Sequence, residues 1–109
     1  MVTQTEANLS TEVGVLDEHS AAELAEFYRA LGDTSRVRIL TALLAGEMHV
    51  GAMAERIGLS DSAVSHHLRG LRQLRLIRAR REGRYVYYSL DDDHVVVLLE
   101  MGLDHVRHR

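Results

Sequence analysis

The 109-residue chain contains no cysteine, no proline and no tryptophan. Without cysteine the protein has no disulfide, no thiolate for a thiophilic metal and no thiol that senses oxidants. This composition fits a reducing compartment, and we expect a cytoplasmic protein. Without proline, internal repeats or a low-complexity stretch, no segment is marked as a linker between domains. A chain of this length therefore predicts one small domain.

Long hydrophobic runs are also missing, since no apolar stretch approaches the roughly 18 residues of a membrane-spanning helix. The first residues, MVTQTEANLSTEVGVLDEHS, have neither the basic start nor the apolar centre of a secretory signal. We expect a soluble chain with a flexible acidic lead-in over residues 1–18 and a folded domain over residues 19–109. So small a domain has little room for a deep substrate cleft, which argues against an enzyme.

Lysine is a further absence, so all 13 basic residues are arginine. From Met1 to Ser35 one arginine stands against seven acidic residues, for a net charge of −6. From Arg36 to Tyr85 ten arginines stand against four acids, for +6, and from Val86 to Arg109 two stand against five, for −3. A basic middle between acidic ends indicates an anionic partner for the middle segment. Arginine suits such a partner, because its planar guanidinium binds phosphate and guanine through two hydrogen bonds.

Helical patterns dominate what is present. Apolar residues recur every three or four positions in five segments, which predicts helices over residues 20–32, 34–46, 50–57, 61–74 and 92–108. Asp33 or Thr34 caps the second of these, and Ser60 caps the fourth. Gly58 supplies a sharp turn between the short third helix and the fourth. A short helix, a glycine turn and a second helix with a polar outer face form a helix-turn-helix.

The period changes in the segment LIRARREGRYVYYSL, residues 76–90, where apolar and polar residues alternate on both sides of a central Glu-Gly. This predicts a β-hairpin, with Tyr85 and Tyr87 on one side of its second strand. The tip of the hairpin carries arginine at three positions, namely Arg80, Arg81 and Arg84. The predicted fold class is therefore mostly α with a β-hairpin wing, an α+β fold.

The outer face of the fourth helix carries short hydroxyl donors and long cations, which reach base edges and phosphates. These candidates are Ser60, Ser62, Ser65, His66, Arg69 and Arg72, and the hairpin adds Arg80, Arg81 and Arg84. A polar helix face by itself is more often an ordinary solvated surface. The order of helix, turn, helix and basic hairpin instead favours double-stranded DNA, with the fourth helix in the major groove and the hairpin on the flanking backbone.

The last predicted helix, within DDDHVVVLLEMGLDHVRHR, carries candidate metal ligands at both ends. Asp92 and His94 can converge where the chain enters the helix, and His105 and His108 are one turn apart at its end. His94 and His105 are about 16 Å apart along the helix, so one ion cannot contact both. In an antiparallel dimer the start of each helix meets the end of the other, and symmetry forms the site twice. One carboxylate and three imidazoles then make the tetrahedral set that suits zinc.

The same residues have a simpler explanation. Acids at the start of a helix and histidine or arginine at its end complement the helix dipole, each contributing about 0.3–1 kcal/mol without any metal. The spacing alone leaves the metal site and the dipole as open alternatives.

The run FYRALGDTSRVRILTALLAGEMHV, and above all LSDSAVSHHLRGLR followed by REGRYVYYSL, resembles the ArsR/SmtB family of bacterial metal-sensing repressors. The resemblance extends from about Glu23 to the end of the chain. It implies a winged helix-turn-helix, in a homodimer packed through its first and last helices, that leaves an inverted-repeat operator when metal binds. The family's interfacial ligand pattern falls on Asp92, His94, His105 and His108. The resemblance thus favours the metal site over the dipole.

Many members of that family have a cysteine motif near the third helix, where this chain has EMHVGAM with His49 in place of a thiol ligand. The resemblance therefore implies Zn(II) as the inducer, with Co(II) or Ni(II) as alternatives if the N-terminal segment adds ligands. It further implies that a ligating histidine signals through a hydrogen bond to a backbone carbonyl near Arg75. Because imidazole binds metal only when neutral, metal binding should weaken as the pH falls towards about 6.

Two other classes remain as alternatives. A metal-blind winged-helix regulator would use the ends of its last helix only to complement the dipole. A zinc hydrolase would use the three histidines and the aspartate for a catalytic ion, but a fourth protein ligand closes the site, and no general base is evident.

Overall fold

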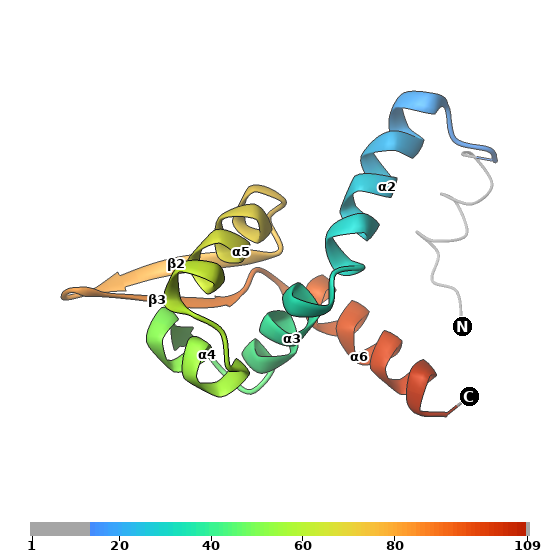
Figure 1. Ribbon diagram of the computed structural model, residues 1–109. Coiled ribbons are helices and arrows are strands. Elements are labelled where there is room, and N and C mark those ends of the chain that lie inside the picture. Colours follow the sequence, from blue (N-terminus) through green and yellow to red (C-terminus); the bar gives the residue numbers. More distant parts are fainter. Residues whose placement is uncertain (1–13, 109) are drawn as a thin grey trace.

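The computed structural model describes residues 14–108 (Figure 1). Within this range the chain forms five α-helices and one antiparallel sheet. In chain order the elements are α2 (Glu18–Leu31), α3 (Thr34–Leu43), β1 (Met48–His49), α4 (Val50–Ile57), α5 (Asp61–Gln73), β2 (Ile77–Glu82), β3 (Tyr85–Leu90) and α6 (Asp93–Arg107). The predicted class of a mostly α fold with a β-hairpin is confirmed. Of the expected lead-in over residues 1–18, the part up to residue 13 lies outside the described residues.

Each helix begins at a side chain that accepts a hydrogen bond from the backbone of its first turn. These caps are Asp17, Asp33, His49, Ser60 and Asp92, in the order of the helices they begin. The caps of α3 and α5 agree with the sequence prediction. Gly58 ends α4 with a φ of 83°, a left-handed conformation that favours glycine, and so forms the expected turn before α5.

The sheet contains a strand that the sequence analysis missed. The strand order is β1-β3-β2, and β1 pairs with β3 through Met48 and His49 only. A strand of two residues is too short to show an alternating pattern, so its partner alone identifies it. The turn between β2 and β3 is Gly83-Arg84, one residue later than predicted, because Glu82 still pairs with Tyr85.

The hydrophobic core lies between α3, α4, α5 and the base of the hairpin. Its fully buried members come from all four, and they include Leu40, Met53, Leu68 and Ile77. In α5 the buried residues are Val64, Leu68 and Leu71, which confirms the predicted inner face of that helix. Burial of this face turns the opposite, polar face of α5 towards solvent.

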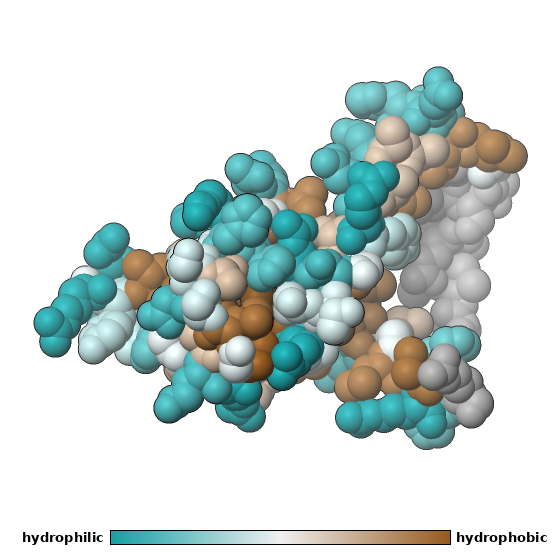
Figure 2. Space-filling model, viewed as in Figure 1, coloured by the Kyte–Doolittle hydropathy of each residue, from teal (hydrophilic) through white to brown (hydrophobic). Residues whose placement is uncertain are grey.

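The helices α2 and α6 project from this core on the side opposite to the hairpin (Figure 1). Ala30 and Val95 are the buried residues of these two helices. Their other apolar side chains include large exposed ones, and brown apolar surface appears over both helices in Figure 2. Among the described residues no helix is both long and apolar enough to cross a membrane.

Candidate nucleic-acid interface and metal ligands

The helix α5 presents a polar surface on the side turned away from the core. Ser62, His66, Arg69 and Arg72 are exposed along it, and Ser65 is half-buried. At the start of the helix, exposed Ser60 accepts a hydrogen bond through Oγ from the Ala63 backbone at 3.0 Å. Five of the six candidates therefore share one side of α5, and Ser60 lies at its N-terminal cap.

The back of α5 is held by an arginine that the sequence analysis missed. Arg36 Nε of α3 donates a hydrogen bond to His67 Nδ1 at 3.4 Å. The same guanidinium lies against Gly70, where a Cβ would come within 2.7 Å of Arg36 Nη2. A glycine inside a helix lowers helix stability, and the close approach of Arg36 explains why glycine stands at position 70. This glycine was the only sequence signal for the contact, and it could be interpreted only after α3 was known to lie beside α5.

The hairpin separates the arginines that the sequence grouped together. Side chains alternate along a strand, so Arg81 shares a sheet face with Tyr88, and Arg80 lies on the other face. Tyr88 lines a hollow together with Arg69 and other residues of α5, so its face is the one next to α5. Arg84 lies exposed in the turn. Of the three candidates, only Arg81 therefore lies on the face next to α5. The guanidinium carbon of Arg84 lies 5.7 Å from the ring centre of Tyr85, on the face that carries Arg80.

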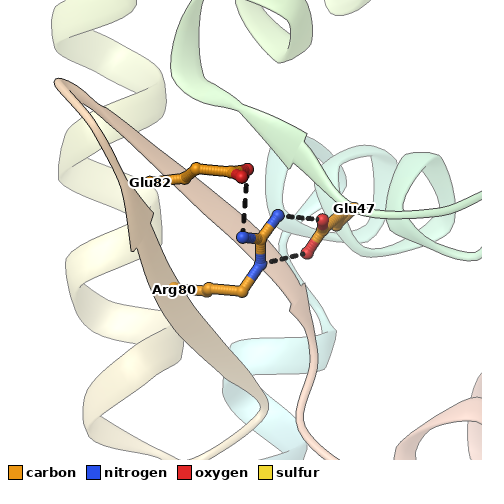
Figure 3. Close-up of polar contacts among 3 residues, drawn as sticks. All are labelled: Glu47, Arg80 and Glu82. Atoms are coloured by element: carbon orange, nitrogen blue, oxygen red, sulfur yellow. Dashed lines mark hydrogen bonds and ion pairs between the residues drawn. The ribbon is translucent and has the colours of Figure 1, made fainter.

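Arg80 is instead surrounded by carboxylates (Figure 3). Its Nη2 and Nε lie 2.5 and 3.3 Å from the two carboxylate oxygens of Glu47, and its Nη1 lies 3.1 Å from Glu82 Oε1. Hydrogen bonds to Glu47 and then to Glu82 raise the pKa of the guanidinium above its usual value. The hydrogen bond from Arg80 in turn holds the pKa of Glu47 below its usual value. Arg80 is thus committed to contacts within the protein.

Asp92 and His94 come together where the chain enters α6. Asp92 Oδ1 accepts a hydrogen bond from the Val95 backbone at 3.2 Å, and Oδ2 lies 3.6 Å from His94 Nδ1. The bond from Val95, and secondarily the contact with His94, hold the pKa of Asp92 below its usual value. The side chain of His94 is 96% exposed. Asp92 Oδ2 and His94 Nε2 are therefore accessible as candidate metal-ligating atoms.

Two histidines lie at the other end of α6. His108 Nδ1 lies 2.8 Å from the backbone oxygen of Asp104 and 3.0 Å from its Oδ1. When Nδ1 donates to that carbonyl, the neutral ring keeps its lone pair on Nε2. Histidines that bind metals commonly hold their other nitrogen in this way. His105, almost one turn earlier, is also exposed.

The four candidate ligands occupy two ends of one helix face. Seven and eleven residues are close to whole numbers of helical turns, so Met101 and His105 lie on the same face of α6 as His94. His94 and His105 remain about 16 Å apart along the axis. Among the described residues of one chain, no group of three or more candidate ligands is close enough to hold a metal ion. The structure thus brings Asp92 and His94 together at the start of α6, leaves His105 and His108 at its end, and forms no single site from the described residues of one chain.

Two further residues named in the metal prediction have defined positions. His49 Nδ1 accepts a hydrogen bond from the Ala52 backbone at 3.3 Å, and its ring packs 5.2 and 5.8 Å from the ring centres of Tyr85 and Tyr87. This histidine therefore caps α4 and supports the hairpin. Arg75 links α5 to β2 with a φ of 59°, a conformation uncommon for a residue other than glycine.

Comparison with known proteins places the central segment in a described family. Residues 33–79 match the family model for bacterial regulatory proteins of the arsR family. This segment runs from the cap of α3 into β2 and includes α4 and α5.

The chain is similar to curated proteins beyond this segment. A transcriptional repressor SmtB homolog from Synechocystis is 48% identical over 96 residues, which are 88% of this chain and 71% of that protein. A cadmium resistance transcriptional regulatory protein, a CadC homolog from Staphylococcus aureus, is 42% identical over 93 residues, which are 84% of this chain and 77% of that protein. Both are regulators of transcription, and neither supports the alternative of a zinc hydrolase.

Among solved structures, Mb0332 from Mycobacterium bovis has a TM-score of 0.78 and 30% sequence identity. The match covers 88% of this chain and 91% of that one. Mb0332 is described as a homodimeric winged helix-turn-helix DNA-binding domain and a possible ArsR-family transcriptional regulator. The similarity confirms the winged helix-turn-helix fold predicted for this chain.

Proposed function

Because the chain belongs to the ArsR/SmtB family of bacterial transcriptional regulators, we propose that it is a zinc-responsive repressor. It binds double-stranded operator DNA as a homodimer and leaves the operator when Zn(II) binds between the two α6 helices. The observation that carries this proposal is the distribution of donors along α6. They are exposed at both ends of the helix, on one face, and too far apart for one chain to hold an ion.

DNA binding is supported by the surface of α5. Arg69 and Arg72 are long enough to reach bases and phosphates, and Ser62 and His66 lie beside them. The hairpin places Arg81 and other exposed arginines beside the flanking DNA backbone. A two-fold dimer presents two copies of α5 to the two halves of an inverted-repeat operator.

A dimer is supported by the apolar surface of α2 and α6. An apolar groove of about 470 Å³ runs between α3 and α6, lined by residues that include Leu31, Val37 and Leu103. Beyond the groove, Tyr28 is 54% exposed and Met101 is 66% exposed. Contiguous exposed apolar surface is typical of an interface between proteins. A second copy packed through α2 and α6 buries this surface.

The donor set fits zinc. Asp92 and His94 of one chain, with His105 and His108 of the other, supply one oxygen and three nitrogens, as in closed tetrahedral zinc sites. Asp92 keeps Oδ2 for the metal because its backbone bond uses Oδ1. Coordinated by these four residues, Zn(II) would link the two chains, and the site would have no open position for catalysis. A link of this kind suits a sensor that couples metal binding to the arrangement of two DNA-binding units.

The proposal is tested by operator binding with and without zinc. The metal-free protein first selects its operator from a pool of random-sequence DNA duplexes. Fluorescence anisotropy then measures affinity for the selected duplex with Zn(II) or with a chelator. We expect Zn(II) to weaken binding at least about tenfold for the native chain and not for His105→Ala. Failure to select any sequence contradicts a repressor, and affinity unchanged by zinc contradicts the zinc response.

The identity of the inducing metal is tested by titration with Co(II). Strong visible absorption bands that saturate at one ion per chain indicate tetrahedral coordination and support zinc as the inducer. Weak bands with tight binding indicate more than four ligands, and thus a protein that responds to Co(II) or Ni(II).

A second candidate function is a metal-blind regulator of the same fold. It is favoured by the hydrogen bonds that Asp92 and His108 already make at the two ends of α6, since both groups serve the helix without a metal. This candidate predicts that His105→Ala has the operator affinity of the native chain, with and without each metal. It also predicts no Co(II) bands.

A further inference from the structure

The β2–β3 hairpin, residues 77–90, is here called the wing, and its attachment to the domain is short. The strand β1 pairs with β3 through Met48 with Tyr88 and His49 with Tyr87, so backbone pairing to the rest of the domain ends at Tyr87. Beyond that level the tip, residues 81–86, is paired only within the hairpin. An isolated two-stranded hairpin is only marginally ordered in water. The direction of the tip therefore depends on side chains near the last pairing.

Arg80 lies at this level. It is directly opposite Tyr87 in the strand register, and its guanidinium carbon lies 5.1 Å from the centre of the Tyr87 ring. The same guanidinium continues to both carboxylate oxygens of Glu47, the residue before β1 (Figure 3). The side chain of Arg80 thus begins on β2, crosses β3 and ends at Glu47 just before β1, and Glu82 contacts it from the side of the tip.

The charge and orientation of Arg80 do not suit a phosphate contact. Its donors are directed at two carboxylates, which more than balance its single positive charge. It lies on the wing face opposite to Tyr88, whereas Tyr88 faces α5. Exposed ion pairs add little to global stability, so the effect of this pair is expected to be local.

We propose that Arg80 is a positioning residue for operator binding, which sets the direction of the wing through its bridge to Glu47. The bridge holds the tip so that Arg81 stays on the wing face next to α5. This inference rests on the proposed DNA-binding function.

The proposal and a direct phosphate contact predict opposite effects for Glu47→Gln. If Arg80 contacted phosphate, loss of Glu47 would release its guanidinium and remove a negative charge near DNA, so binding would tighten. If Arg80 positions the wing, loss of Glu47 loosens the tip, and binding weakens although a negative charge is gone. The sign of the change separates the two roles.

The experiment measures affinity for the selected operator duplex over a series of salt concentrations. We expect Glu47→Gln and Arg80→Gln each to weaken binding by about three- to tenfold, with the salt dependence of the native chain. Arg81→Gln, the neighbour on the other face, is the matched control. It should make the negative slope of log affinity against log salt less steep by about 0.9. Arg80→Lys keeps the charge but not the fork geometry and should behave like Arg80→Gln.

Amide hydrogen exchange of the tip, residues 81–86, gives a second readout without DNA. We expect faster exchange in Glu47→Gln and Arg80→Gln and native exchange in Arg81→Gln. Tighter binding by Glu47→Gln, a slope loss of about 0.9 in Arg80→Gln, or native exchange in both bridge variants would overturn the proposal. If the native chain selects no operator, the DNA-binding function fails, and hydrogen exchange still tests the bridge.

Discussion

The region from α3 to β3 and the pair α2 and α6 contain similar aliphatic residues in different environments. In the first region Leu40 and Leu68 are buried at 0% and 1% exposure, in a core closed within one chain. In the second, Leu24 and Met101 remain exposed on helices that project from that core. The first region buries its apolar side chains within one chain, whereas the second leaves them exposed, and we propose that a second copy covers them.

Histidines follow the same division. His49 caps α4 and His67 accepts a hydrogen bond from Arg36, so both serve the structure of one chain. His94 and His105 extend from α6 into solvent. Residue type alone therefore does not distinguish a structural histidine from a candidate ligand, whereas the contacts of its ring do.

The largest contrast should come from one substitution made in both regions. Leu68→Ala removes a fully buried side chain, and we expect it to lower the free energy of unfolding by about 2–5 kcal/mol. Leu24→Ala should cost less than about 1 kcal/mol, because that side chain is 44% exposed. Urea unfolding at a chain concentration low enough for monomers measures both. Equal losses would mean that α2 is packed as firmly as α5.

The next effect concerns the interface itself. Met101→Glu places a carboxylate on the α6 face that also carries His94 and His105, and two-fold symmetry introduces it twice. We expect the dissociation constant of the dimer to rise about 100-fold or more, because an unpaired charge is costly to bury. Sedimentation analysis measures it, with Glu100→Gln, an exposed site elsewhere on α6, as control. A dimer unaffected by Met101→Glu would have its interface elsewhere.

A smaller change is expected on the DNA-binding side. Arg69→Ala should weaken operator affinity about tenfold, because it removes a contact of α5 with DNA. If that contact is to a phosphate, the negative slope of log affinity against log salt becomes less steep by about 0.9. Its dimer should remain intact, which separates the two regions. Anisotropy titrations compare it with Arg38→Ala, an exposed arginine of α3. The same slope loss in Arg38→Ala would point to overall charge and not to α5.

The smallest predicted effect is a pH dependence at the start of α2. Asp17 Oδ1 accepts the Ser20 backbone N–H at 2.7 Å, and this bond holds the pKa of Asp17 below its usual value. Because the pKa of Asp17 is lower in the folded chain, its carboxylate stabilises the folded state at a pH above the unfolded pKa of about 3.9. This contribution is lost as the pH falls through the folded pKa. Native protein should therefore lose more stability between about pH 4 and 2 than Asp17→Asn, as thermal unfolding can measure. The same loss of stability with pH in both proteins would contradict a stabilising role of the Asp17 carboxylate.

Much of the fold was predictable, because its helices are amphipathic and begin at strong caps. The periods of 3.6 and 2 located α4 and the hairpin closely, and the pattern of α5 identified its buried face. The strand β1 was not predictable from local pattern, since its two residues pair with β3 far along the chain. Similarly, nothing near Glu47 indicates Arg80, which is 33 positions away.

The candidate site was also predictable only in part, because it depends on contacts between segments that are far apart in the chain. Alternation already separates Arg80 from Arg81, but which of them lies next to α5 depends on how the sheet packs. The spacing of His94 and His105 shows that one helix cannot hold the ion, and the fold of one chain leaves the two pairs apart. We propose that the complete site belongs to two chains, in which case neither the sequence pattern nor one folded chain contains it.

A mixed dimer tests this central claim most directly. His94→Ala and His105→Ala homodimers each lack one ligand in both sites, whereas a mixed dimer has one site with all four ligands and one that lacks two. With differently tagged chains the mixed dimer can be isolated and titrated with Co(II). Our account predicts strong tetrahedral bands for one ion per mixed dimer and none of that strength for either homodimer. If mixing restores no bands, the ligands do not come from two α6 helices, and the interfacial site is wrong.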